Sequence, residues 1–231
     1  MGTDIHLGVE RLHNGKWEPL EDVLPSHEEL MKAYDNCGSE DPEIRRAATE
    51  LLNRMPWHRN YDLFAMLADV RNGVGFGGYE RCERVTPLFA GRGRPEDSCF
   101  PELEQMWLGG YHSYTWCTYA EAMKAPWTRP VVTKGVIPYE HWLRWRLSDN
   151  PHPDSWSQGV FGGGVRTVDE AEAALMKENR DEIEGVYVRS QWEWQPLADS
   201  PFRRWLLSPE FQAAAAKYGP ENIRICMSFD S

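Results

Sequence analysis

The sequence lacks any apolar run near the roughly 20 residues that a membrane-spanning helix needs, and it contains no C-x-x-C pair. It also lacks the pattern of a secretory signal peptide. The cysteines are odd in number and scattered: Cys37, Cys82, Cys99, Cys117 and Cys226. These absences argue against a membrane protein, a disulfide framework and a zinc knuckle. We therefore expect a cytoplasmic protein with reduced thiols.

Positive charge is also scarce. The chain has 25 Lys and Arg against 36 Asp and Glu, which gives a formal charge of −11 at pH 7. A protein that binds nucleic acid by general phosphate attraction needs the opposite balance, so we expect no non-specific nucleic-acid binding. The remaining composition, 41% hydrophobic and 26% charged, is that of a globular protein. Eleven Trp supply aromatic surface that must be buried or stack on a ligand.

The first stretch of the chain alternates between apolar and polar residues. The apolar positions are Ile5, Leu7 and Val9, and between them lie Asp4, His6, Gly8 and Glu10. Period-two alternation predicts a half-buried β-strand with Asp4 and His6 on one face. A carboxylate beside an imidazole can move protons or bind a divalent metal ion. The structural alternative is an Asp at the strand start and a His on a solvated face.

A hairpin is predicted directly after this strand. Asn14-Gly15 is a favoured sequence for a two-residue type I′ turn. Counting outward places Arg11 opposite Glu18, and this opposite-charge pair supports the register. Pro19 cannot donate to a ladder, so the second strand is an edge strand or ends there.

The two ends of the chain are predicted to be strands that pair with each other. Asn222–Phe229 alternates like the first strand, and such pairing would tie down both ends. Helical patterns cover 26–55 and 139–146, and Ser208-Pro209-Glu210 is expected to open a helix that runs through Ala216. Asn60 is expected to cap a further helix. Capping boxes at Thr118–Glu121 and Thr167–Glu170 begin two more, the second of which runs to about Asn179. We predict an α+β single domain over 1–231, with a mainly antiparallel sheet that includes both terminal strands and helices over one face. Residues 126–166, rich in Pro, Trp and Gly, are predicted to form an insertion, a lid or an oligomer contact.

A second candidate stretch contains polar groups among aromatic residues: Tyr111, His112, Ser113, Tyr114 and Trp116. It precedes the predicted helix at Thr118, and free N–H groups at a helix N-terminus attract anions. Adjacent strand residues point to opposite faces, so a nucleophilic pair of His112 and Ser113 is weakly supported.

Four arginines and one aspartate complete the candidate set: Arg59, Arg71, Arg92, Arg94 and Asp62. The arginines lie in polar segments, where guanidinium groups can clamp a phosphate or remain solvated. Asp62 falls in the first turn of a predicted helix, where the helix dipole favours a negative charge. A structural role for Asp62 is therefore as well supported as a catalytic one.

Several segments in order along the chain resemble a family of uncharacterised bacteriophage proteins. These segments are Met1–His6, Arg59–Ala65, Ala68–Gly73, Arg94–Asp97 and the final Phe229-Asp230. Family members carry a Gly-His-Ser-His-Ser-like segment, and this chain keeps one of its histidines as His112. The resemblance implies a phage origin and action in the cytoplasm of the host, but it implies no reaction.

Thr3–Gly8 is also similar to the first metal-binding segment of calcineurin-like metallophosphoesterases, where an Asp-x-His holds a metal ion. That segment follows a buried parallel strand, whereas here a hairpin follows it. The Gly-Asp and Gly-Asn-His segments are missing as well. We therefore set membership aside and keep convergent use of Asp4 and His6 as an option.

Three functional hypotheses remain. The first is a hydrolase or lyase that acts on a phosphate-bearing, nucleotide-like small molecule. Its proton-transfer residues would be Asp4, His6 and His112, with Asp62 as a further candidate; the substrate would be held by Arg59, Arg71, Arg92, Arg94, Ser113, Tyr111 and Trp116. Asp4, His6 and His112 would bind any divalent ion, Mn²⁺, Mg²⁺ or Zn²⁺.

The second hypothesis is a non-catalytic binder that sequesters a nucleotide immune signal of the host, in keeping with counter-defence. The third is an inhibitor that blocks a host protein through its acidic surface and exposed Trp. Both follow from the implied phage origin, because binding alone is sufficient for either role. A homo-oligomer is compatible with all three hypotheses.

Overall fold

The computed structural model describes residues 3–53, 55–56, 59–74, 78, 80–100, 111–176 and 183–230. The chain divides into two compact units with separate hydrophobic cores. The terminal-strand unit comprises residues 2–70, 86–127 and 197–231, and the tryptophan-rich unit comprises residues 71–85 and 128–196. We had expected a single domain over 1–231. Most of the predicted insertion, 126–166, belongs to the tryptophan-rich unit, and its role as a lid stays a prediction.

The terminal-strand unit is built on a four-stranded antiparallel sheet. Its strands are β1 (Ile5–His13), β2 (Lys16–Pro19), β3 (His112–Thr118) and β7 (Ile223–Phe229), in the order β2-β1-β7-β3. Asn14 and Gly15 both have positive φ, as a type I′ turn requires, and Arg11 lies opposite Glu18. The predicted hairpin, its register and its edge position are confirmed.

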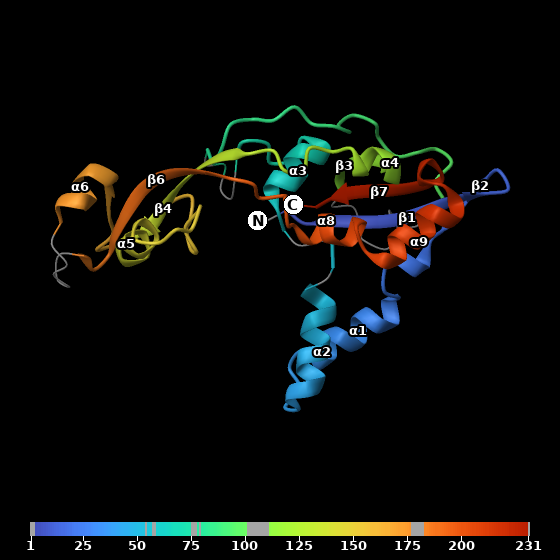
Figure 1. Cartoon of the computed structure of the whole chain (residues 1–231), viewed down its shortest axis with the longest axis horizontal. Helices are drawn as coiled ribbons and strands as arrows, with labels where there is room; N and C mark the ends of the chain where they lie inside the picture. The colour runs from blue at the N-terminus through green and yellow to red at the C-terminus, as the bar shows by residue number, and fades with distance from the viewer. Residues whose placement is uncertain are drawn as a thin grey trace. The chain divides into compact units, whose positions relative to one another are not determined.

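The first and last strands pair as predicted. Ile5 lies opposite Phe229 and Arg11 opposite Ile223, so that β1 and β7 run side by side (Figure 1). The α+β class, with a mainly antiparallel sheet that contains both terminal strands, is confirmed. One face of this sheet carries the core residues Ile5, Val9, Ile225 and Phe229.

Four helices of the same unit contribute to this core, together with the 3₁₀ turn η1 (Glu21–Val23). They are α3 (Tyr61–Ala68), α4 (Tyr119–Met123), α8 (Pro201–Leu206) and α9 (Pro209–Tyr218). The unit also contains α1 (His27–Asn36), α2 (Pro42–Asn53) and the 3₁₀ turn η4 (Pro220–Asn222). Asn60 caps α3, Thr118 forms a capping box on α4 and Ser208 caps α9, as predicted. Phe64 from α3 and Phe211 from α9 are fully buried in the core.

The tryptophan-rich unit has a three-stranded sheet of its own. Its strands are β4 (Val131–Pro138), β5 (Arg166–Asp169) and β6 (Val186–Trp194), in the order β4-β6-β5, with β5 parallel to β6. Helices α5 (Tyr139–Arg146) and α6 (Glu170–Leu175) complete it. Ile137, Trp142, Val188 and Trp192 lie at the centre of its core.

The predicted start of α6 is wrong by two residues. Thr167 is extended and pairs with Tyr187, so it belongs to β5 rather than to a capping box. Asp169 is the N-cap, and its carboxylate accepts from the Glu172 N–H at 2.7 Å. The helix ends at Leu175, and the predicted end at Asn179 lies outside the described residues.

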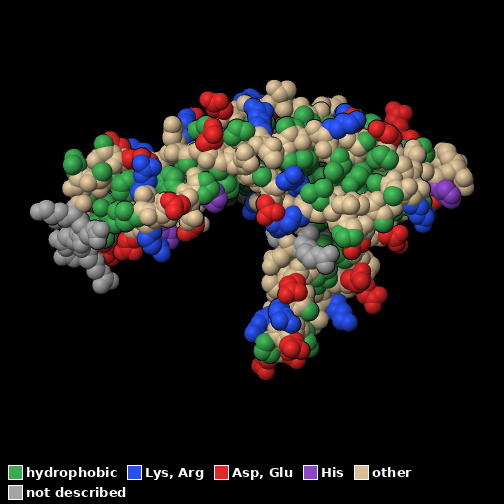
Figure 2. Space-filling view, viewed as in Figure 1, with side chains coloured by type: hydrophobic (Ala, Val, Ile, Leu, Met, Phe, Trp, Pro, Cys, Tyr) green, Lys and Arg blue, Asp and Glu red, His purple; other side chains and the backbone are tan. Residues whose placement is uncertain are grey.

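Two further expectations concern the surface. No helix in the described parts of the chain combines the length and the apolarity that crossing a bilayer requires. Figure 2 shows acidic and basic side chains mixed over the face in view. Each of the nine Trp that the structure describes is buried or half-buried. The exposed Trp on which the inhibitor hypothesis relied are therefore not found among them.

Candidate functional site

The second face of the four-stranded sheet is polar and is covered by the segment 92–100. His6, Gly8 and Glu10 of β1 lie on this face, directly opposite Ser228, Cys226 and Arg224 of β7. The ring of Phe100 packs on Gly8, where a Cβ atom would lie 2.9 Å from the ring. The absence of a side chain at Gly8 thus lets the covering segment approach the sheet.

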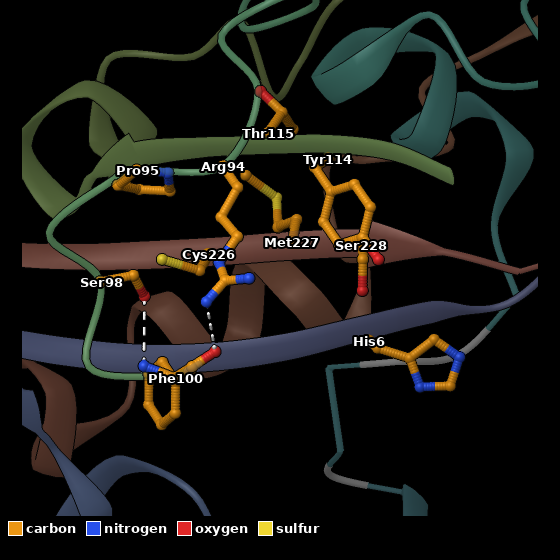
Figure 3. A pocket seen from close by; sticks show the side chains of 10 residues that line it. All are labelled: His6, Arg94, Pro95, Ser98, Phe100, Tyr114, Thr115, Cys226, Met227 and Ser228. Carbon is orange, nitrogen blue, oxygen red and sulfur yellow. Dashed lines mark hydrogen bonds between the residues drawn. The ribbon is translucent and has the colours of Figure 1, made fainter. Parts of the chain in front are cut away.

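A small cavity of about 30 Å³ lies between this segment and the strands. Its lining residues are His6, Arg94, Pro95, Ser98, Phe100, Tyr114, Thr115, Cys226, Met227 and Ser228. Figure 3 shows Arg94 crossing β7, where its guanidinium donates to the Phe100 carbonyl at 3.3 Å. In the same view Tyr114 extends from β3 toward Ser228. This volume holds one or two water molecules.

A chain of polar contacts fixes His6 at one end of the cavity. Its Nε2 lies 3.2 Å from Oδ2 of Asp230, whose Oδ1 accepts from the Asp4 N–H at 2.9 Å. Arg59 then holds the Asp4 carboxylate with two bonds of 2.9 and 2.6 Å. The ring of Tyr111 meets the His6 ring edge-on at 4.6 Å. Sequence reasoning paired Asp4 with His6, whereas the structure places Asp230 between them.

Asp230 is ionised in this chain of contacts, because its pKa lies below the usual value. Burial acts to raise it, but hydrogen bonds from the Asp4 N–H and from His6 outweigh burial and lower the pKa. An ionised carboxylate only accepts hydrogen bonds, so Nε2 of His6 carries a proton and faces it. In the neutral imidazole, Nδ1 is then the atom that can accept a proton.

Behind the cavity lies a buried ion pair that sequence reasoning missed. Glu10 is fully buried and accepts from the Arg224 guanidinium, from Ser98 Oγ at 3.1 Å and from the Cys99 N–H at 2.9 Å. Arg224 also donates to Asp97 at 2.8 Å. Since Asp97, Ser98 and Cys99 belong to the covering segment, this network fastens that segment to the sheet. The alternation of the first strand placed Glu10 on the His6 face, but nothing in the sequence marked Arg224 as its partner.

Aromatic rings and a thiol surround the ion pair. The Arg224 guanidinium lies 4.0 Å from the centre of the Trp17 ring and 5.5 Å from that of Trp116. Cys226 donates to Glu10 at 3.4 Å, and burial together with this carboxylate raises the pKa of its thiol to about 12. The Cys226 sulfur is thus protonated at neutral pH.

The predicted His112 and Ser113 lie together on β3, against expectation. Nδ1 of His112 is 2.9 Å from Ser113 Oγ. The two side chains were expected on opposite faces, but the register of β3 shifts between His112 and Thr115, and Ser113 has φ of 55°. This β-bulge turns the Ser113 side chain toward its neighbour.

The remaining predicted residues serve other contacts. Arg92 holds Glu121 with bonds of 2.9 and 2.8 Å and stacks over Trp116. The hydrogen bond from Arg92 is the largest cause that lowers the pKa of Glu121, to about 2. Asp62 is buried in the first turn of α3. Arg71 belongs to the tryptophan-rich unit.

The predicted metal site has no three-ligand group to support it. In the part of the chain that the structure describes, no three His, Cys, Asp or Glu side chains are arranged to hold an ion. Asp4 binds Arg59, His6 binds Asp230 and His112 contacts Ser113. The metal-binding role of Asp4, His6 and His112 stays a prediction.

Similarity to known proteins assigns no function to this chain, so its function has to be inferred from the chemistry of the site. No protein-family model, curated protein or solved structure matches the chain. The resemblance to phage proteins accordingly stays a prediction.

Proposed function

We propose that the protein binds a phosphate-bearing, nucleotide-like small molecule at the cavity of Arg94 and His6, and that His6 transfers a proton in the hydrolysis of its phosphoester. The observation that carries the proposal is that Arg94 and the His6–Asp230 pair flank one cavity. A planar guanidinium suits a phosphate group. An imidazole held by a carboxylate suits proton transfer near neutral pH.

The reaction uses groups that lie at the cavity. Nδ1 of His6 accepts a proton from water, the water oxygen forms a bond to phosphorus, and the bond from phosphorus to the leaving oxygen breaks. The imidazolium then gives the proton to the leaving oxygen, which restores neutral His6. Asp230 holds Nε2 and stabilises the imidazolium that forms. Because the cavity has room for only one or two water molecules, it would hold the attacking water, and the phosphate with the rest of the ligand would lie at its mouth.

A non-catalytic binder is the second candidate, and one observation favours it. The raised pKa of Cys226 keeps the sulfur of the cavity protonated, so this side chain supplies no nucleophile at neutral pH. A protein that only sequesters a nucleotide signal needs Arg94 but no proton transfer. This reading also fits the predicted phage origin and a counter-defence role.

Binding and turnover can be separated by experiment. The purified protein is first screened by thermal shift against inorganic phosphate, nucleotides and cyclic dinucleotides, each with Mn²⁺, Mg²⁺, Zn²⁺ or EDTA. A ligand at 100 times its Kd stabilises the fold by about 2.7 kcal/mol. Phosphoester hydrolysis is then measured on every ligand that binds.

The variants Arg94→Ala, His6→Gln and Asp230→Asn identify the roles, with Arg46→Ala on the exposed side of α2 as control. Loss of turnover with retained binding in His6→Gln supports hydrolysis. Binding that depends on Arg94 without any turnover in the wild type supports the binder. The proposal is overturned if no phosphate-bearing compound binds, or if Arg94→Ala binds as well as Arg46→Ala.

A further inference from the structure

A second and larger depression lies in the terminal-strand unit. This groove measures about 1060 Å³ and is bordered by β1, η1, the start of α1, the end of α2, and α8 and α9. Apart from Phe100, it shares no lining residue with the cavity of His6 and Arg94. Small-molecule pockets usually measure roughly 300–1,000 Å³, so the groove has room for a polypeptide segment.

The floor of the groove is apolar. Val9, Leu20 and Trp205 lie at its base and are buried, and the half-buried Leu24, Leu51 and Phe100 also line it. Leu207, at the mouth, has 41% of its surface exposed although it is apolar. Covering the apolar surface that Leu24, Leu51, Phe100 and Leu207 still expose would be favourable.

The walls of the groove are acidic. Four exposed carboxylates line it, those of Glu21, Asp22, Glu29 and Glu210. Hydrogen bonds from Ser26 lower the pKa of Glu29, which stays ionised at neutral pH. Among the lining residues that the structure describes, Arg204 is the one basic side chain, and it is paired with Asp199 at 3.0 Å. The groove thus presents negative charge around an apolar floor.

We infer that this groove docks a basic amphipathic helix of a partner protein. An apolar stripe on the helix would cover the floor, while flanking Lys and Arg would meet the carboxylates of the wall. This is the helix-in-groove mode of recognition, in which charge complementarity sets orientation and association rate. The inference is independent of the phosphate site, because it uses different residues and a different class of ligand.

The test is fluorescence anisotropy with a labelled 18-residue Leu/Lys peptide whose leucines form one helical face. The full chain is expected to bind it more weakly as salt rises. A peptide of the same composition with scrambled order, and a Leu/Glu peptide with the same leucine pattern, should bind at least tenfold more weakly.

Groove variants and a matched control locate the binding. The double variant Glu21→Lys with Asp22→Lys should lower the affinity for the Leu/Lys peptide at least tenfold. The variant Leu207→Asp should do the same. The control, Asp149→Lys with Glu193→Lys, makes the same change in net charge at exposed positions of the tryptophan-rich unit. It should change affinity less than twofold.

Three results would overturn the inference. The first is no binding of the Leu/Lys peptide, and the second is equal binding of the scrambled peptide. The third is an equal loss of affinity in the groove variants and the control, which would assign binding to net charge. If sedimentation shows a dimer that Leu207→Asp dissociates, the occupant is a second copy of the chain, and the inference fails. Circular dichroism checks that each variant is folded.

Discussion

Glu10 of β1 and Arg224 of β7 lie directly opposite each other and form a buried ion pair. The Glu10 side chain is fully buried and that of Arg224 is 5% exposed. The same carboxylate holds Ser98 and Cys99 of the covering segment. One buried charge pair therefore maintains both the centre of the sheet and the wall of the cavity.

Removing this carboxylate should strongly destabilise the protein. Glu10→Gln leaves the buried Arg224 guanidinium with only the exposed Asp97 as counter-charge, and breaking a buried pair costs about 3–5 kcal/mol. We expect a loss of that size in the free energy of unfolding, measured by urea titration. The control, Glu18→Gln, breaks the half-exposed pair with Arg11 and should cost less than about 1 kcal/mol. Equal losses in the two variants would contradict this account.

Ionised Glu121 should make part of the free energy of unfolding depend on pH. Its pKa in the folded state is about 2, below the usual 4.5, so its contribution is complete above pH 4.5 and is lost as pH falls toward 2. Glu121→Gln should therefore be less stable than the wild type at pH 6, and the difference should shrink to nothing near pH 2. Urea titrations between pH 2 and 6 measure it. A difference that stays constant with pH would refute the role of the charge.

Gly8 should be intolerant of a side chain. The added Cβ of Gly8→Ala would lie 2.9 Å from the Phe100 ring, and overpacking of this kind costs about 1–3 kcal/mol. Gly38→Ala, where nothing lies within 4 Å, should change stability by less than about 0.5 kcal/mol. Combining Gly8→Ala with Phe100→Leu should recover part of the loss, because the smaller side chain gives room. Full additivity of the two changes would rule out this contact as the cause.

Asp4 should matter more for the site than for the fold. Its pair with Arg59 is nearly half exposed on both sides, and pairs of this kind contribute about 0–1 kcal/mol. Asp4→Ala and His6→Ala should therefore melt within a few degrees of the wild type, as measured by thermal denaturation. The activity of both variants should be lost if the first hypothesis holds. If both fail to fold, the two side chains are structural.

Local patterns predicted much of the fold. The hairpin register follows from Asn14-Gly15, because a two-residue turn fixes the pairing on either side. The caps at Asn60, Thr118 and Ser208 were predicted for the same reason, since a cap involves residues only two or three positions apart. The tryptophan-rich unit was missed as a separate unit, because nothing local reveals that residues 137–192 enclose a core of their own.

The site was predicted in part. His6 and Arg94 do line one cavity, but the partners that position them come from distant segments. Asp230 reaches His6, and Arg224 reaches Glu10, only because β1 and β7 pair in one particular register. The pairing of Arg92 with Glu121 could not be predicted, because spacing in the sequence does not show it. The bulge at Ser113 likewise depends on the pairing of β3 with β7.

The position of β7 between β1 and β3 has a consequence for how the protein is made. Glu10 and Arg224 are 214 positions apart, so a ribosome synthesises most of the chain after β1 before its central partner emerges. Until then the inner edges of β1 and β3 are unpaired, and open strand edges invite association with other chains. Pairing over such a separation is slow, so the sheet forms late. The nascent terminal-strand unit is therefore prone to aggregation until β7 pairs with β1 and β3.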